Sequence, residues 1–164
     1  MPSTLPTTHT LEVRTSRNGL GVFVKRAFKA GEVLYVVEGK KVTCDIDDDM
    51  DEQARSNTYR FDEEYYLSPQ GTLGDYFNHS CHPNAKVEKR GQKLRMVAIR
   101  NIPQGREVCF DYSTITASDD VWKMRCHCGE KMCRKSIRSF GTLPSPLQCR
   151  YIREQIVPQY ILDI

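Results

Sequence analysis

A chain of 164 residues, with 39% hydrophobic and 27% charged residues, is long enough to bury the core of one ordinary globular domain. No apolar run approaches the roughly 20 residues that a membrane-spanning helix needs. The Pro/Thr-rich residues 1–10 lack the charged and apolar regions of a signal peptide, so we expect a loose lead-in there. The net charge of +3 is too small to require a nucleic-acid partner.

Short runs rich in Val, Ile, Tyr and Phe recur along the chain, and Gly, Pro or Asn separates them, which is typical of β-strands. Ala30-Gly31, Arg90-Gly91-Gln92 and Pro103-Gln104-Gly105 are predicted to be turns. The predicted strands are Leu11–Val13, Gly21–Val24, Val33–Val37, Tyr65–Leu67, Val87–Lys89, Leu94–Ile99 and Val108–Phe110.

Helical signals are few. Residues 48–56 could form a short helix. The clearest candidate is near the C-terminus, where Ser145 can cap and Pro146 suits the first helical position. The apolar residues that follow have helical spacing, and Pro158 should end or kink the helix. We therefore predict a mostly β single domain.

Charge is distributed unevenly along the chain. Residues 45–64 carry nine acids against Arg55 and Arg60, whereas residues 122–138 carry six bases against Glu130 alone. Charge runs are usually just solvated surface. The functional alternatives are an acidic wall that attracts a basic substrate, and nonspecific contact of Lys123 to Arg138 with nucleic acid.

Seven cysteines, an odd number, without a secretion signal favour reduced thiols and an intracellular protein. Cys126, Cys128 and Cys133 lie on one compact loop, and a structural zinc site needs four nitrogen or sulfur ligands. The spacing leaves the fourth ligand open between His127, Cys81 and Cys109. Unmetallated thiols are the alternative for the loop. Cys44, Cys109 and Cys149 fall outside any ligand spacing and are expected to be small core or surface residues.

Three further segments combine glycine, polar and aromatic residues. They are Gly19-Leu20-Gly21, Asn78-His79-Ser80-Cys81-His82-Pro83-Asn84 and Glu107-Val108-Cys109-Phe110-Asp111-Tyr112. The Gly-x-Gly segment lets the backbone approach a ligand, although a turn between strands explains it equally well. In this order, with Cys126 fourteen residues after Tyr112, the motifs resemble the SET-domain protein lysine methyltransferases with a cysteine-rich post-SET tail.

The resemblance covers residues from about Gly19 to Cys133. It implies a SET fold: mostly β, with short strands in small sheets, a knot-like C-terminal segment, few short helices and a C-terminal helix. It also implies a SET domain over residues 11–118 with a variable insert at about 43–70, a post-SET zinc loop over 119–138 and a C-terminal helical extension over 139–164. With no cysteine-rich segment ahead of the domain, the chain is similar to minimal, free-standing members.

The resemblance implies S-adenosylmethionine and Zn²⁺ as cofactors, and Tyr112 as the catalytic residue. A phenol oxygen can hold a polarised methyl group through weak C–H···O contacts and orient the attacking amine. The implied zinc ligands are Cys81, Cys126, Cys128 and Cys133. The implied cofactor-binding residues are Gly19, Leu20, Gly21, Asn78, His79, Tyr112, Trp122 and Cys128.

The resemblance also indicates a narrow aromatic channel for the substrate lysine. Phe110 stands where the family carries Phe or Tyr, and Phe implies di- or trimethylation because it leaves more room. The chain departs from the family pattern at Val37, Ser68 and Asp75, where Tyr, Asp and Arg are usual. The candidate channel residues are Phe110, Tyr76, Tyr65 and Tyr66, with Tyr59 as a further one.

A basic protein, with a histone tail favoured, is the implied substrate, and the acidic residues 45–64 would form one wall of its groove. The implied location is the nucleus or chromatin in a eukaryote, and the cytoplasm or a host cell for a bacterial or viral protein. Two alternatives remain: a non-catalytic SET-fold module that binds a basic tail, and a zinc-containing nucleic-acid binder that uses Lys123 to Arg138.

Overall fold

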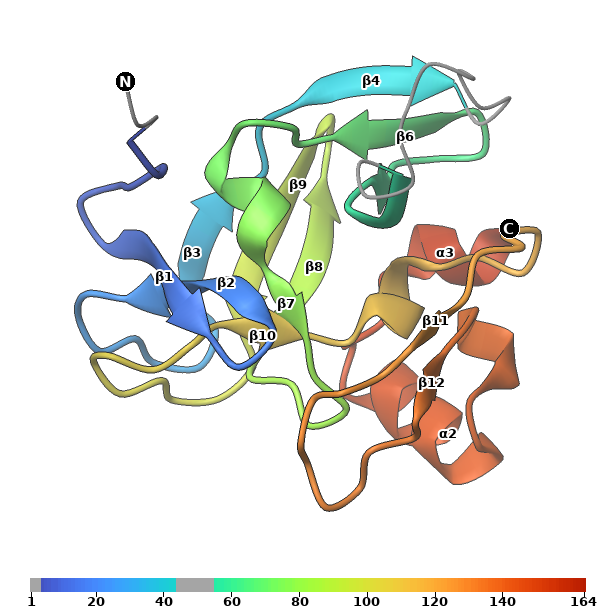
Figure 1. Ribbon diagram of the computed structural model, residues 1–164. Helices are drawn as coiled ribbons and strands as arrows, with labels where there is room; N and C mark the ends of the chain where they lie inside the picture. Colours follow the sequence, from blue (N-terminus) through green and yellow to red (C-terminus); the bar gives the residue numbers. More distant parts are fainter. Residues whose placement is uncertain (1–3, 44–54) are drawn as a thin grey trace.

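The computed structural model describes residues 4–43 and 55–164. These residues form five small β-sheets of two or three strands each, joined by short helical segments (Figure 1). The mostly β architecture predicted from the sequence is confirmed. The predicted helix over residues 48–56 lies largely outside the described residues, as does most of the acidic run.

One three-stranded sheet has the order β3-β9-β8, with β3 at Val33–Val36, β8 at Ala85–Arg90 and β9 at Lys93–Ala98. Strands β8 and β9 form the predicted hairpin. Gly91 has a φ of 56° in its turn, a conformation that favours glycine. Alternate residues of these strands, such as Val87 and Met96, are buried in the main core.

A second three-stranded sheet has the order β4-β6-β5, with β4 at Lys40–Thr43, β5 at Tyr59–Arg60 and β6 at Tyr65–Ser68. The sequence patterns predict only β6. Strand β4 escapes them because three of its four residues are exposed, so it shows no apolar alternation. Figure 1 shows this sheet above the β3-β9-β8 sheet.

Two strand pairs carry the sequence motifs. Strand β1 at Leu11–Ser16 pairs antiparallel with β2 at Gly19–Val24, and the register brings Ser16 opposite Gly19 across a tight turn. Strand β7 at Asn78–His79 pairs parallel with β10 at Cys109–Phe110. The 3-10 helix η1 at Leu73–Tyr76 precedes β7, and η2 at Tyr112–Ile115 follows β10.

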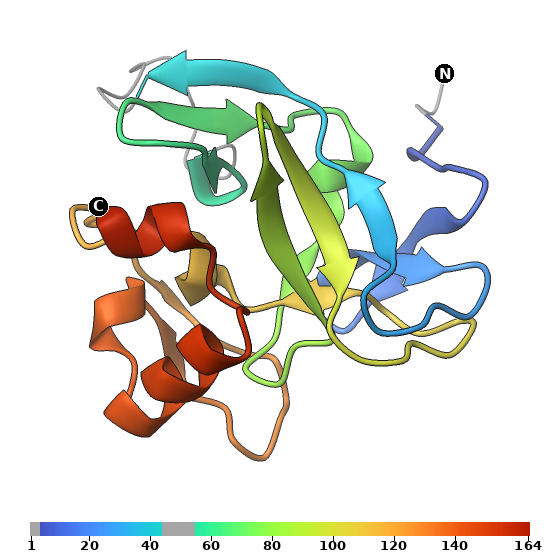
Figure 2. The ribbon, with the colours of Figure 1, turned by 180° about the vertical axis from the view of Figure 1, so that it is seen from behind.

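The chain after residue 116 forms one end of the molecule (Figure 2). It contains β11 at Met124–Arg125, β12 at Ser136–Ile137, η3 at Phe140–Thr142, α2 at Ser145–Arg153 and α3 at Gln159–Asp163. These helices bury their own hydrophobic cluster. None of the helices in the described part of the chain has the length and apolar character to cross a membrane.

The predicted C-terminal helix is confirmed, but its start differs by one residue. Pro144 occupies the position before the helix, and Ser145 is its first residue instead of a cap. Helix α2 ends at Arg153, before Pro158, and Pro158 then precedes α3. This agrees with the fixed φ of proline, which suits the first turn of a helix better than its interior.

Candidate functional site

Strands β7 and β10 place two distant motifs side by side. Their register pairs Asn78 with Cys109 and His79 with Phe110, although the motifs are some thirty residues apart. Ser80 continues the pairing, since its backbone N–H donates to the Phe110 carbonyl at 3.1 Å. The motifs therefore meet at one end of a short parallel ladder, and Tyr112 follows directly.

Tyr112 is held at both ends. Its backbone N–H donates to Nδ1 of His79 at 3.0 Å, and its hydroxyl donates to the Phe77 carbonyl at 2.6 Å. Its ring centroid lies 4.9 Å from that of Phe110 and 6.3 Å from that of Trp122. Burial raises the pKa of Tyr112 well above the ordinary phenol value, so the hydroxyl stays protonated at neutral pH.

The Tyr112 ring lines a cavity of about 270 Å³ with aromatic and aliphatic walls. Of the candidate channel residues, Phe110, Tyr66 and Tyr59 line this cavity, and Tyr65 and Tyr76 are not among its lining residues. The other hydrophobic side chains of the wall are Val42, Phe77, Ile115, Val121 and Trp122. A mostly apolar pocket of this size suits a long alkyl chain that ends in a small polar group.

One wall of the cavity is fixed by a buried cation. The Arg60 side chain is 2% exposed, and its Nη1 lies 2.9 Å from an Asp119 oxygen and 3.1 Å from Asp120 Oδ1. Tyr66 donates its hydroxyl to the same Asp120 carboxylate. On the other side, the Tyr160 hydroxyl of α3 donates to the Arg60 carbonyl at 2.6 Å. Helix α3 therefore braces this wall of the cavity through the Tyr160 hydrogen bond.

The Gly19-Leu20-Gly21 segment and Asn78 come together at β2. Asn78 Nδ2 donates to the Leu20 carbonyl at 2.9 Å and to Glu107 Oε1 at 2.8 Å. A Cβ at Gly21 would lie 2.1 Å from Glu107 Oε1, so a side chain there would force Glu107 to move. Gly19 has a φ of 100°, which makes the turn after Asn18. The structure thus brings these cofactor candidates onto one surface.

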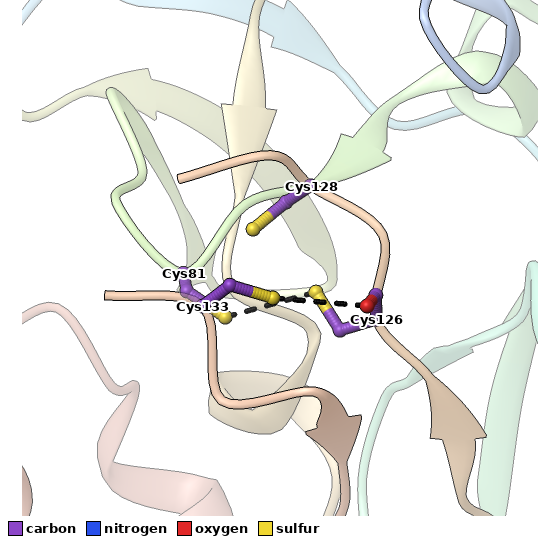
Figure 3. A group of neighbouring side chains, drawn as sticks. All are labelled: Cys81, Cys126, Cys128 and Cys133. Atoms are coloured by element: carbon purple, nitrogen blue, oxygen red, sulfur yellow. Dashed lines mark hydrogen bonds between the residues drawn. The ribbon is translucent and has the colours of Figure 1, made fainter. Parts of the chain in front are cut away.

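Four cysteines converge beside this surface. The Sγ atoms of Cys81, Cys126, Cys128 and Cys133 all lie within 4.8 Å of one another (Figure 3). A tetrahedral site with metal–sulfur bonds of about 2.3 Å places its sulfurs about 3.8 Å apart. The Cys81–Cys126 Sγ distance is 3.7 Å. The donor set and spacing therefore fit a four-coordinate metal, and Cys81 is the cysteine that completes the loop cluster.

The surroundings shift the pKa values of the cluster's thiols in opposite directions, lowering that of Cys133 and raising those of Cys81 and Cys126. The Lys135 backbone N–H, in a residue with φ of 64°, holds the pKa of Cys133 at about 7. Cys81 is more buried, and desolvation raises its pKa to about 11 in the absence of a metal. His127 is exposed, and Cys109 lies on β10, so neither belongs to the cluster. Asn18 Nδ2 donates to the His127 carbonyl at 3.2 Å, which joins the cysteine loop to the β1–β2 turn.

His79 lies between Tyr112 and the cysteine cluster. Its Nδ1 accepts the Tyr112 N–H, and its Nε2 lies 3.3 Å from Cys81 Sγ. Burial lowers the pKa of His79 to about 4, with Asp111 opposing this shift and Arg134 adding to it. The imidazole is therefore neutral at physiological pH.

The departures from the family pattern fall at different places. Asp75 lines the cavity and accepts a hydrogen bond from Asn57 Nδ2 at 2.9 Å. Val37 is buried in the main core, and its N–H donates to the Leu94 carbonyl. Ser68 pairs with Lys40 in the β4–β6 ladder.

The described acidic residues of the run 45–64 are not among the lining residues of the cavity at Tyr112. Asp62, Glu63 and Glu64 line a second, more open cavity of about 350 Å³, together with Tyr160 and residues 163–164. Asp45, Asp47, Asp48, Asp49, Asp51 and Glu52 lie outside the described residues. An acidic wall formed by residues 45–64 therefore stays a prediction.

Comparison with known proteins gives the family. A model of the SET domain matches residues 19–113. The chain belongs to the SET-domain family. The match begins at the Gly-x-Gly segment and ends one residue after Tyr112, so it contains both motifs that β7 and β10 bring together.

Several relatives of this SET domain are named histone-lysine N-methyltransferases. An H3 lysine-36 specific enzyme from Yarrowia lipolytica is 33% identical over 135 residues, covering 74% of this chain and 17% of the relative. The trr enzyme from Drosophila melanogaster is 28% identical over 133 residues, covering 74% of this chain and 5% of the relative. ASHH3 from Arabidopsis thaliana is 26% identical over 148 residues, covering 81% of this chain and 38% of the relative. The chain thus spans between 5% and 38% of the length of these relatives.

Solved structures share the SET fold. KRYPTONITE in complex with mCHG DNA and SAH superposes with a TM-score of 0.61 at 25% identity, covering 77% of this chain and 28% of that one. KRYPTONITE in complex with mCHH DNA, an H3(1-15) peptide and SAH superposes with a TM-score of 0.61 at 23% identity, covering 77% of this chain and 29% of that one. These structures confirm the predicted SET fold.

Several contributors to the site are not evident from the sequence. Asn57, Asp75 and Asp120 line the cavity, and Glu107 anchors Asn78. They come from separate segments with no shared spacing, so no linear pattern groups them. Two of them carry a sequence signal: Glu107 opens the run that closes with Tyr112, and Asp75 departs from the family pattern.

Proposed function

We propose that this SET domain transfers a methyl group from S-adenosylmethionine to the side-chain amine of a lysine in a basic protein. A histone tail is the favoured substrate, and di- or trimethyl-lysine the expected product. The observation that carries the proposal is the Tyr112 phenol, held at 2.6 Å by the Phe77 carbonyl in the wall of the aromatic cavity. It stands beside the strand that carries Asn78 and His79.

The chemistry requires positioning, because methyl transfer from a sulfonium is an in-line displacement without a covalent enzyme intermediate. Bound S-adenosylmethionine would supply the methyl group. Tyr112, with its hydroxyl protonated and its backbone fixed by His79, would hold and orient the reacting groups. The rings of Phe110, Tyr66 and Tyr59 would exclude water and lower the pKa of the lysine amine by desolvation. Aromatic faces also favour a methylated ammonium product.

The β2–β7 surface is the proposed cofactor site. Both hydrogen bonds that Asn78 makes to described residues use its Nδ2, which leaves its Oδ1 for a ligand. Gly19 and Leu20 are exposed there. Gly19 and Gly21 have no side chain that would keep a ligand away from the backbone. Trp122 and Cys128 are proposed to border the adenine. SAH, which is S-adenosylmethionine after loss of its methyl group, is bound in both KRYPTONITE structures.

Zinc is the proposed metal of the four-cysteine cluster, and residues 119–138 the proposed post-SET loop. Four thiolates in a closed tetrahedral set are the donors of a structural zinc site. The metal would tie this loop to Cys81 beside Asn78 and His79, and the hydrogen bond from Asn18 joins the same loop to the β1–β2 turn. It would therefore support the cofactor surface without taking part in chemistry.

A basic tail is the proposed substrate class, with chromatin in a eukaryotic nucleus as the setting that the relatives favour. The exposed bases Lys123, Arg125, Lys131, Lys135 and Arg138 would add nonspecific contact with nucleosomal DNA. Arg134 is excluded from this surface because it bonds the buried Asp111. Salt-sensitive DNA binding without base preference would support this contact.

The test is incubation with S-adenosylmethionine labelled in its methyl group and a panel of histones and other basic proteins. Mass spectrometry should map the label to lysine side chains. Labelling of no protein, with intact cofactor binding, would instead support a non-catalytic module that holds a basic tail. The presence of Tyr112, Asn78 and His79 weighs against that alternative. Asp75 and Val37 favour it, because both depart from the family pattern.

A further inference from the structure

The His79 side chain makes two contacts within the protein, in addition to the cofactor-binding role that is proposed for this residue. Its side chain is 6% exposed, between β7, the start of η2 and the cysteine cluster. One ring nitrogen, Nδ1, lies 3.0 Å from the Tyr112 backbone nitrogen. The other, Nε2, lies 3.3 Å from Cys81 Sγ. One ring thus spans the distance between the candidate catalytic residue and a candidate metal ligand.

The direction of these two hydrogen bonds follows from donor chemistry. A backbone amide can only donate, so Nδ1 must be the acceptor and carries no proton. A neutral imidazole then has its proton on Nε2, which faces Cys81 Sγ and donates to it. The nearest carboxylate oxygen, Asp111 Oδ1, is 3.6 Å from Nδ1 and already accepts from Arg134 and the Ser113 amide. The surroundings therefore select a single tautomer.

We infer that His79 is a positioning residue that links the cysteine cluster to Tyr112. A Cys81 thiolate bound to a metal accepts the Nε2–H, and the ring so oriented holds the Tyr112 amide at the start of η2. The Phe77 carbonyl fixes the other end of Tyr112. Metal loading and placement of the phenol are then coupled through one imidazole. The inference rests on the proposed function for the role of Tyr112, and on the fit of the four cysteines to a metal.

The coupling has a limit that the structure sets. The β7–β10 pairing and the Ser80–Phe110 hydrogen bond also hold the chain up to residue 110. Loss of the imidazole should therefore loosen Tyr112 without unfolding the domain. Ligand-orienting partners of this kind typically change metal affinity by about 10–100-fold.

The first test uses the unaltered protein loaded with Zn²⁺. Long-range ¹H–¹⁵N NMR of the histidine rings reports which nitrogen carries the proton, and a His79→Gln spectrum assigns the resonance. We expect a neutral ring with the proton on Nε2 and an unprotonated, hydrogen-bonded Nδ1. A proton on Nδ1 would overturn the inference, because Nδ1 could then not accept from Tyr112.

The second test separates the two hydrogen bonds by substitution. An Asn amide stands close to the Nδ1 position, and a Gln amide reaches as far as Nε2. His79→Asn should thus weaken Zn²⁺ binding, measured by competition with a chromophoric chelator, by about tenfold or more, and His79→Gln by less than threefold. His79→Gln loses the contact with the Tyr112 amide. In this variant, the fold-decrease in turnover number should therefore exceed the fold-decrease in Zn²⁺ affinity.

His82→Leu is the matched control. His82 is exposed in the same motif, and its Nε2 contacts Arg100 instead of a cysteine. It should leave Zn²⁺ affinity unchanged. Equal Zn²⁺ affinities for the wild type, His79→Asn and His79→Gln would overturn the inference. If the wild type transfers no methyl group, the proposed function fails, and the tautomer and the Zn²⁺ affinities still decide the inference.

Discussion

Gly21→Ala is expected to damage both stability and cofactor binding, through a contact that the structure makes specific. Gly21 has no positive φ that would itself oppose alanine, so the backbone is not the obstacle. The obstacle is space, since the new Cβ would lie 2.1 Å from Glu107 Oε1 and 2.9 Å from Asn78 Nδ2. Glu107 must move, and with it the hydrogen bonds that it accepts.

The cost follows from those hydrogen bonds. Glu107 accepts from Ser16 Oγ at 2.8 and 2.9 Å and from Asn78 Nδ2 at 2.8 Å. A hydrogen bond to a charged group contributes about 1.5–3 kcal/mol, and Glu107 is only half-buried, so we expect a loss of about 2–4 kcal/mol. For a chain of this size that lowers Tm by roughly 5–15 °C. Displacing Asn78 should also raise the Kd for S-adenosylmethionine by about tenfold.

Thermal unfolding and calorimetric titration with S-adenosylmethionine measure the two effects. Gly141→Ala is the control, because nothing lies within 4 Å of its new Cβ. In a Glu107→Ala background the closer of the two clash partners is absent, so adding Gly21→Ala should cost less than it does in the wild type. A Gly21→Ala protein with wild-type Tm and cofactor affinity would refute this account of the β2–β7 surface.

Three further predictions concern the channel, the metal and the C-terminal extension. Phe110→Tyr adds a hydroxyl to a ring of the cavity that is only 2% exposed, so monomethyl-lysine should accumulate. The rate of the first methyl transfer should stay within about tenfold of the wild-type rate. Mass spectrometry of a single-lysine peptide measures both effects. If wild-type product stops at one methyl group under excess cofactor, Phe110 does not set the limit. Cys81→Ser should lower both zinc content, by elemental analysis, and activity, and full zinc occupancy would place the fourth ligand elsewhere. Tyr151→Phe removes the donor at 2.9 Å to the buried Asp111 and should cost about 1.5–3 kcal/mol in urea unfolding, whereas the exposed Ile152→Ala should cost much less.

Local chemistry explains what the sequence could predict. The β8–β9 hairpin follows from its glycine turn and apolar alternation, and the cysteine loop from its spacing. Both signals are contained in a few consecutive residues. Asn78 and Tyr112 were expected to share a site because the motifs resemble a family, and the parallel β7–β10 pair brings them together.

The rest depends on long-range packing. Strand β7 is only two residues long, and its partner β10 is no longer, so neither has a periodic pattern of its own. The direction of Asp75 into the cavity depends on the 3-10 turn η1, which its sequence does not specify. The cavity wall at Arg60 forms only when β5, residues 119–120 and α3 meet. Asp119 is 59 residues and Tyr160 is 100 residues from Arg60 along the chain.

The central claim is that Tyr112 supports methyl transfer to lysine in this cavity. The most direct measurement compares the wild type with Tyr112→Phe in transfer of labelled methyl groups from S-adenosylmethionine to the favoured basic protein. The account predicts lysine methylation by the wild type and turnover at least about 100-fold lower in the variant, the effect of losing a transition-state contact, with Tm and cofactor affinity nearly unchanged. Wild-type turnover by a correctly folded Tyr112→Phe protein would contradict it.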